Sequence, residues 1–130
     1  MNNKTVARRF YDAVNAGKLE IIDEVVDEKF VEHEEFPGLA GGREGLRQFF
    51  EMIRTAFPDF SLTIEDMVAE GDKVFIRATM KGIQKGEFMG VSASGKQMAV
   101  PFADILRFDS GRVVEHWGIT DTGTMMRQLT

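Results

Sequence analysis

The sequence predicts an α+β fold in which a curved, mostly antiparallel sheet is closed by three N-terminal helices to form a cone. Two observations lead to this prediction. Apolar residues recur at helical spacing over the first 57 residues, whereas residues 60–120 alternate as strands do and are broken by glycine turns. The 130 residues are expected to form one domain, 1–130, because this length supports a single hydrophobic core.

The helices are expected in the N-terminal part of the chain. Val6, Phe10 and Val14 lie on one face of a helix predicted over residues 3–16, and Gly17 is suited to end it. The other two predicted helices are a short one with Leu19, Ile22, Val25 and Val26 on one face, and a longer one over 43–57 with Leu46, Phe49, Phe50, Ile53, Ala56 and Phe57.

The strands follow the helices, except for one short strand predicted over residues 29–34. The later strands are expected over 60–69, 73–84, 97–108 and 112–120, and the tail with Met125, Met126 and Leu129 is expected to form a final helical turn. A curved sheet closed by helices encloses a space that suits a small molecule.

Composition narrows the possible functions. The chain has no cysteine and only two histidines, His33 and His116, so no metal site is expected. A net charge of −5 disfavours nucleic acid as a partner. No apolar run approaches the roughly 20 residues of a membrane span, so no membrane partner is expected, and without an apolar signal region a cytoplasmic location is expected. Eleven phenylalanines and eight methionines favour an apolar, adaptable interior.

Asp104 is the most informative polar residue. One face of its predicted strand carries Met98, Val100, Phe102, Asp104, Leu106 and Phe108. An aspartate on an apolar face is costly unless it is paired or protonated, so Asp104 is a candidate for acid–base chemistry in a pocket. The alternative is that the strand twists and Asp104 reaches a backbone amide or Arg77.

The last strand offers a second candidate carboxylate. Simple alternation places Val113, Glu115, Trp117, Ile119 and Asp121 on one face and His116 on the other. Trp117 is therefore expected in the pocket wall, and His116 outside it. Asp121 either enters the pocket or caps the final helical turn.

His33 is the third candidate, because a histidine titrates near neutral pH without help. A structural or exposed role for this side chain is the alternative. The neighbouring acidic residues Glu32, Glu34 and Glu35 are expected to be solvated.

Several motifs together resemble a known superfamily. They are residues 10–17, His33 before Pro37 and Gly38, residues 42–45, 56–59, 86–90, 94–96 and 107–113, and residues 115–117 followed by Asp121. The chain resembles the nuclear-transport-factor-2-like superfamily and, within it, the SnoaL-like polyketide cyclases. This resemblance implies the cone-shaped α+β fold, a homodimer or higher homo-oligomer, and no metal or organic cofactor. It also implies that Asp121 acts as the acid/base of an intramolecular aldol ring closure.

Two related branches fit less well. The stretch from Asp104 to Arg107 and Phe108 is similar to a strand motif of the ketosteroid isomerases, in which a protonated aspartate donates to a dienolate oxygen. Their oxyanion tyrosine would fall at Phe10, one position from Tyr11, and their base aspartate near His33. Limonene-epoxide hydrolases need an arginine where this chain has Phe102. The cyclases themselves often carry a glycine–threonine–histidine motif that is replaced here by residues 81–84.

The sequence therefore predicts a small-molecule enzyme of the SnoaL-like type that uses carboxylate acid/base chemistry. Its ligand is expected to be a small hydrophobic carbonyl compound, and its reaction an aldol cyclisation or a related isomerase or lyase step. Asp121, Asp104 and His33 are the predicted catalytic residues, and Trp117, Phe102, Tyr11, Phe10 and Phe50 are predicted to bind the substrate. The alternative is a non-catalytic ligand-binding or assembly module of the same fold.

Overall fold

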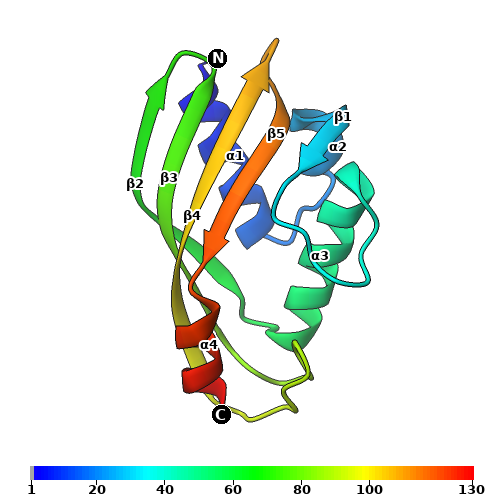
Figure 1. Ribbon diagram of the computed structural model, residues 1–130, viewed down its shortest axis with the longest axis vertical. Coiled ribbons are helices and arrows are strands. Elements are labelled where there is room, and N and C mark those ends of the chain that lie inside the picture. The colour runs from blue at the N-terminus through cyan, green and yellow to red at the C-terminus, as the bar shows by residue number, and fades with distance from the viewer. Residues whose placement is uncertain (1) are drawn as a thin grey trace.

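The computed structural model describes residues 2–130. Its elements are α1 (Asn3–Asn15), α2 (Ile21–Val25), β1 (Val26–Glu32), α3 (Gly42–Ala56), β2 (Ser61–Glu70), β3 (Lys73–Ile83), β4 (Gln97–Asp109), β5 (Arg112–Thr120) and α4 (Thr122–Leu129) (Figure 1). The α+β class is confirmed. The predicted closure by three N-terminal helices is not, because a fourth helix, α4, packs against β4 and β1 separates α2 from α3. No helix among the described residues is long and apolar enough to cross a membrane.

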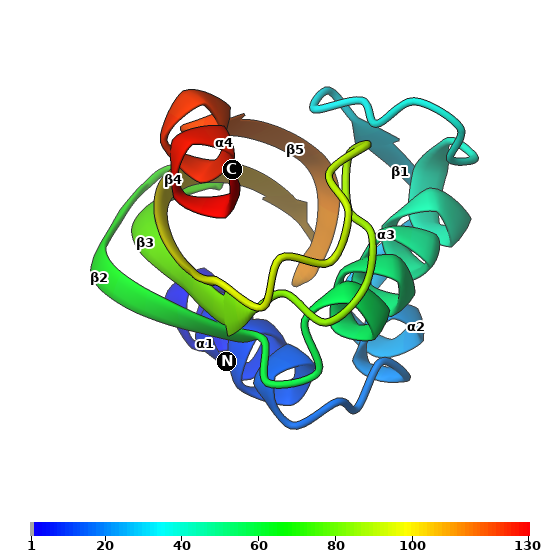
Figure 2. The ribbon, with the colours of Figure 1, turned by 90° about the horizontal axis from the view of Figure 1, so that it is seen from below.

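The five strands form one sheet in the order β1-β5-β4-β3-β2. β1 runs parallel to β5, and all other neighbours are antiparallel. Figure 2 shows the sheet curling so that α1 and α3 lie on its concave side. The apolar stripe of α3 produces this packing, because Phe50, Ile53 and Ala56 recur every three residues and are buried together.

A β-bulge near the start of β5 changes which side chains face the core. Arg107 pairs with Glu115 but Phe108 pairs with Val113, so Val114 is an extra residue on β5. Because side chains alternate along a strand, one extra residue moves every later side chain to the opposite face. Val113 is therefore buried in the core and His116, three residues later, also faces inward.

The connection between β3 and β4 is organised by one buried side chain, Gln84. Its Nε2 donates to the carbonyl oxygens of Gly86 at 3.1 Å and Val91 at 2.8 Å. Its Oε1 accepts from the backbone N–H of Ser94 at 3.2 Å and from the hydroxyl of the same residue at 2.7 Å. Because every polar atom of the amide is used, this connection is held against the core.

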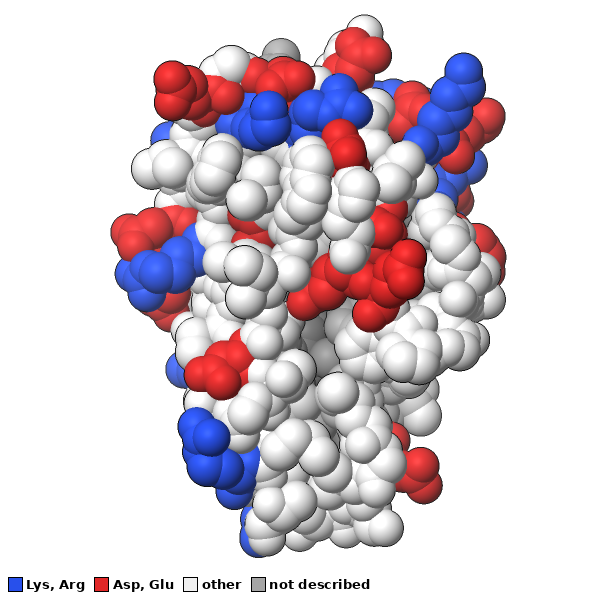
Figure 3. All heavy atoms as spheres, viewed as in Figure 1, with Lys and Arg blue, Asp and Glu red and all other residues white. Residues whose placement is uncertain are grey.

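The outer, convex face of the sheet carries apolar side chains in water. Val31, Val68, Phe75 and Ile119 are exposed there. In the view of Figure 3, charged side chains gather toward the top of the molecule, and a group of acidic side chains borders a hollow near the middle. The concave face, with the helices over it, encloses the cavity described next.

Candidate active site

A cavity of about 550 Å³ lies between the concave face of the sheet, α1, α3 and residues 34–42. This volume suits a small organic molecule. The apolar wall is dominated by phenylalanine rings: Phe10, Phe30, Phe36, Phe49, Phe50, Phe60, Phe88 and Phe102. Polar side chains are concentrated at one part of this wall, where β1, β4 and β5 meet.

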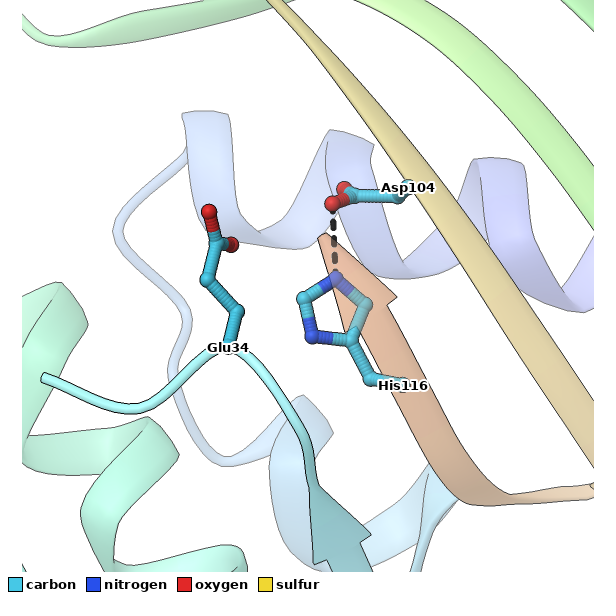
Figure 4. Close-up of side chains that lie close together, drawn as sticks. All are labelled: Glu34, Asp104 and His116. Atoms are coloured by element: carbon cyan, nitrogen blue, oxygen red, sulfur yellow. Dashed lines mark hydrogen bonds and ion pairs between the residues drawn. The ribbon is translucent and has the colours of Figure 1, made fainter. Parts of the chain in front are cut away.

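Asp104 and His116 form the centre of this polar end (Figure 4). Asp104 comes from β4 and His116 from β5, and the Nε2 of His116 lies 2.7 Å from Oδ1 of Asp104. The hydroxyl of Tyr11, on α1, donates to Oδ2 of the same carboxylate. Glu32, at the end of β1, lies 2.5 Å from Nδ1 of His116 through its Oε1. The four side chains therefore form one continuous hydrogen-bonded chain.

The position of His116 between two carboxylates determines its charge. Burial opposes the charged imidazolium, but hydrogen bonds and electrostatic attraction from Asp104 and Glu32 outweigh this cost. Together they raise the pKa of His116 from 6.5 to about 10. At neutral pH the ring is therefore protonated on both nitrogens and donates to both carboxylates.

Tyr11 remains a neutral donor for similar reasons. Burial, and then the charge and hydrogen bond of Asp104, raise the pKa of Tyr11 well above 10. Asp104 thus accepts hydrogen bonds from two donors, Tyr11 and His116, and is held between α1 and β5.

Glu34 lies beside this pair but is bonded differently. Its Oε2 accepts from the hydroxyl of Thr120 at 2.9 Å, and no donor among residues 2–130 bonds its Oε1. Burial raises the pKa of Glu34; Thr120 and His116 oppose the shift, whereas the negative charges of Asp104 and Glu32 add to it. One carboxylate oxygen of enhanced basicity is therefore free at the polar end of the cavity.

Glu34, Asp104 and His116 also have the residue types and spacing of a metal site. One ligand atom from each lies within 4.8 Å of the other two. A protonated imidazole has no lone pair for a metal, and both nitrogens of His116 already bond carboxylates. In this hydrogen-bonded form the three side chains are arranged for proton transfer. No lysine or arginine among the described residues lines the cavity, and the one cationic lining group, His116, already bonds two carboxylates.

The predicted site residues divide into two groups. Phe10, Tyr11, Phe50, Phe102 and Asp104 line the cavity. His33, Trp117 and Asp121 are not among its lining residues, so the predicted convergence of His33, Asp104 and Asp121 is wrong. The alternative partner of Asp104, Arg77, instead pairs with Asp66 on the outer face.

His33 and Trp117 stack on each other on the convex face of the sheet. Their ring centroids are 4.9 Å apart and nearly parallel, at 9°. The Nε2 of His33 lies 2.6 Å from Oε2 of Glu115, and Oε1 of the same carboxylate accepts from Nε of Arg107 at 2.7 Å. The bulge at Val114 explains the position of Trp117, because it turns Trp117 outward and His116 inward. His33 faces outward because it alternates with Glu32 and Glu34, which line the cavity.

Asp121 is the N-cap of α4. Its Oδ1 accepts from the backbone N–H of Thr124 at 3.0 Å, and its Oδ2 from the hydroxyl of the same residue at 2.7 Å. These bonds lower the pKa of Asp121, as expected for a carboxylate at a helix N-terminus. Asp121 therefore caps α4, which is the alternative role that the sequence left open for it.

Three site residues were not predicted: His116, Glu32 and Glu34. The expectation that Glu32, Glu34 and Glu35 are solvated is wrong for Glu32 and Glu34, which line the cavity and are half-buried, whereas Glu35 is exposed. A signal for them was present in the sequence. Phe30, Glu32 and Glu34 follow at intervals of two, so the buried ring of Phe30 places both carboxylates toward the core.

The fold and site define a small α+β protein with an acid–base cluster in an apolar cavity, and the comparisons identify its family. The family model of the SnoaL-like polyketide cyclases matches residues 5–129. The chain therefore belongs to the SnoaL-like polyketide cyclase family, which has the nuclear-transport-factor-2-like fold. None of the curated proteins matches it significantly.

Solved structures support this assignment along the whole chain. IdmH from Streptomyces antibioticus, described as "a putative polyketide cyclase", is 33% identical with a TM-score of 0.87, and the match covers 99% of each chain. TsrD from Streptomyces laurentii is 31% identical with a TM-score of 0.88, covering 97% of this chain and 92% of TsrD. AclR from Streptomyces galilaeus, described as "a putative hydroxylase", is 28% identical with a TM-score of 0.85, covering 98% and 94%.

Proposed function

We propose that this protein catalyses a cofactor-independent acid–base reaction on a small hydrophobic carbonyl compound, and that the reaction is an intramolecular aldol cyclisation. One observation carries the proposal: a carboxylate with a free oxygen, Glu34, lies beside the Asp104–His116 pair in an otherwise apolar cavity. Membership of the SnoaL-like family supports the same class of reaction.

Glu34 is the proposed general base. Its Oε1 is not committed to a donor, and partial burial raises its pKa, so it is a stronger base than a solvated carboxylate. A carbon acid next to a carbonyl group gives its proton to Oε1. The electron pair left on carbon then attacks a second carbonyl carbon of the same molecule, and a carbon–carbon bond closes the ring.

Tyr11 and His116 are the proposed donors to substrate oxygen. Both donate to Asp104, so a substrate oxygen beside Asp104 competes for the same O–H and N–H groups. His116, with a pKa of about 10, remains protonated at neutral pH and can transfer a proton to the more basic alkoxide formed by ring closure. The proton gained by Glu34 offsets the one that His116 releases, so the step consumes no proton overall.

The test uses an aromatic diketone, a benzene ring with neighbouring acetyl and acetonyl side chains, which closes to a naphthol after aldol addition and loss of water. Naphthol fluorescence reports ring closure. Glu34→Gln is expected to lower kcat/KM by about 100-fold or more, the usual contribution of a general base. Glu28→Gln, at an exposed position on β1, is the matched control and is expected to keep the wild-type rate.

Two results would overturn the proposal. One is naphthol formation by Glu34→Gln at the wild-type rate, which would remove Glu34 from the chemistry. The other is tight binding of the diketone with no naphthol formation above the rate in buffer. That second result would identify a binding module.

A further inference from the structure

We propose that Gly118 is the positioning residue for Glu34: the side chain missing at this position of β5 leaves the space that the Glu34 carboxylate occupies. The inference rests on the proposed role of Glu34 as a base, and it adds the residue that allows this base to reach the site. It starts from a gap in the inward face of β5.

Three consecutive inward positions of β5 are His116, Gly118 and Thr120. His116 bonds Asp104, and Thr120 donates to Glu34. Gly118, between them, pairs directly with Asp104 on β4. The gap at Gly118 therefore lies between the acid–base pair and the hydroxyl that holds Glu34.

The carboxylate of Glu34 fills this gap. A Cβ atom built on Gly118 would lie 2.1 Å from Oε1 and 2.7 Å from Cδ of Glu34, and 2.9 Å from Cε1 of His116. Cβ atoms essentially never approach other heavy atoms closer than 3.0 Å. Even an alanine at this position must displace the carboxylate or the imidazole.

The backbone does not explain a glycine here. Gly17 and Gly71 have φ angles of +75° and +59°, which favour glycine, but Gly118 is not among the positive-φ residues. It lies within a regular strand, where a glycine leaves the sheet less stable than a residue with a side chain. The structure does show one reason for a glycine at position 118, which is that the Glu34 carboxylate needs the space.

This space matters because Glu34 comes from outside the strand that carries the pair. It follows β1, the edge strand, and its side chain reaches over β5 toward Asp104 on the next strand. With a side chain at 118 that path is blocked, and Oε1 moves away from the imidazole. Gly118 thus acts on the reaction through Glu34 and does not itself contact the reacting atoms.

The experiment follows the Glu34 carboxyl directly, in protein labelled with ¹³C at the glutamate carboxyl carbon, with Glu34→Gln to assign the signal. In Gly118→Ala the pKa of Glu34 is expected to fall from its raised value toward 4.5. Gly82→Ala is the control, since it also crowds a strand glycine, against Phe57, away from the site. An unchanged Glu34 titration in folded Gly118→Ala would overturn the proposal.

A rescue variant gives a second readout. Glu34→Asp shortens the side chain by one methylene and withdraws the carboxylate from position 118. The double variant Gly118→Ala with Glu34→Asp is expected to form naphthol at least 10-fold faster than Gly118→Ala alone. A double variant no faster than Gly118→Ala alone counts against the positioning role.

Thermal unfolding keeps the proposal testable if Gly118→Ala folds poorly. The two closest clashes are with Glu34 and only the contact of 2.9 Å is with His116, so Gly118→Ala is expected to lower Tm clearly more in the presence of Glu34 than in a Glu34→Ala background. An equal decrease in both backgrounds would contradict the proposal. These titration and stability readouts do not depend on turnover, so an inactive wild-type protein would overturn the proposed function and leave this inference intact.

Discussion

Asp104 and His116, on adjacent antiparallel strands, are joined by a hydrogen bond of 2.7 Å inside an apolar cavity. The pair is partly shielded from water, with 12% and 13% of the two side chains exposed. Because water screens such a pair poorly, the charge of each member depends strongly on the other.

Replacing His116 by phenylalanine should destabilise the protein strongly. The variant leaves Asp104 and Glu32 without their shared cation, and removing one partner of a buried ionic network costs about 3–5 kcal/mol. His33→Phe is the control, since His33 is 40% exposed and its pair with Glu115 should contribute at most about 1 kcal/mol. Chemical denaturation measures both, and similar losses for the two variants would contradict this account.

The charge of His116 makes stability depend on pH in a defined direction. The folded pKa, about 10, lies above the unfolded value near 6.5. The folded state therefore binds the proton more tightly, and this stabilisation is complete below pH 6.5. It is lost as the pH rises from about 6.5 through about 10. The unfolding free energy of the wild type should fall over this range more steeply than that of His116→Phe, and parallel curves would refute the assignment.

The phenol of Tyr11 gives a direct optical test, because it is the only tyrosine in the chain. Burial and the charge of Asp104 raise its pKa well above 10. The folded protein should show no phenolate absorption while the pH passes through 10, whereas the protein in denaturant should titrate near 10. Phenolate formation at the same pH in both states would show that Tyr11 is solvated.

Removing the Tyr11 hydroxyl should affect both stability and catalysis. Tyr11→Phe loses a hydrogen bond to a charged acceptor, which costs about 1.5–3 kcal/mol. It also removes one proposed donor to substrate oxygen, so kcat for naphthol formation should fall. A variant that is destabilised but fully active would leave His116 as the only donor.

Asp121 should matter for α4 and not for the reaction. Asp121→Ala removes the cap on Thr124 and should lower Tm by about 2–5 °C, a typical effect of a lost helix cap. Because Asp121 does not line the cavity, naphthol formation measured well below Tm should keep the wild-type rate. A large loss of turnover with unchanged Tm would restore Asp121 as the acid/base.

Much of the fold was predictable because its signals are local. The stripe of α3 and the alternation of β3 and β4 bury the residues that periodicity selects. Asp104 was found for the same reason, since β4 is regular around it and a charged residue among apolar ones is conspicuous. The cavity-lining Phe10, Phe50 and Phe102 follow from faces that are equally regular.

The exchange of His116 and Trp117 arises where a strand pairing decides the outcome. The sequence of β5 contains nothing that marks Val114 as an extra residue, because the bulge exists only in the register between Arg107 and Glu115. Simple alternation therefore exchanged His116 and Trp117. The errors at Glu32 and Glu34 have another cause: acidic residues near the end of an edge strand are usually solvated, but here Glu32 bonds the buried His116 and Glu34 accepts from Thr120.

The amide of Gln84 has a consequence for ligand exchange. It ties down the connection that carries Phe88, whose ring forms part of the cavity wall and packs against Phe36 and Phe57. Opening the wall at this ring requires breaking hydrogen bonds of the Gln84 side chain, which does not line the cavity. The firmness of this part of the wall is therefore set apart from the chemistry at Asp104, and Gln84→Leu should loosen it without altering the catalytic groups.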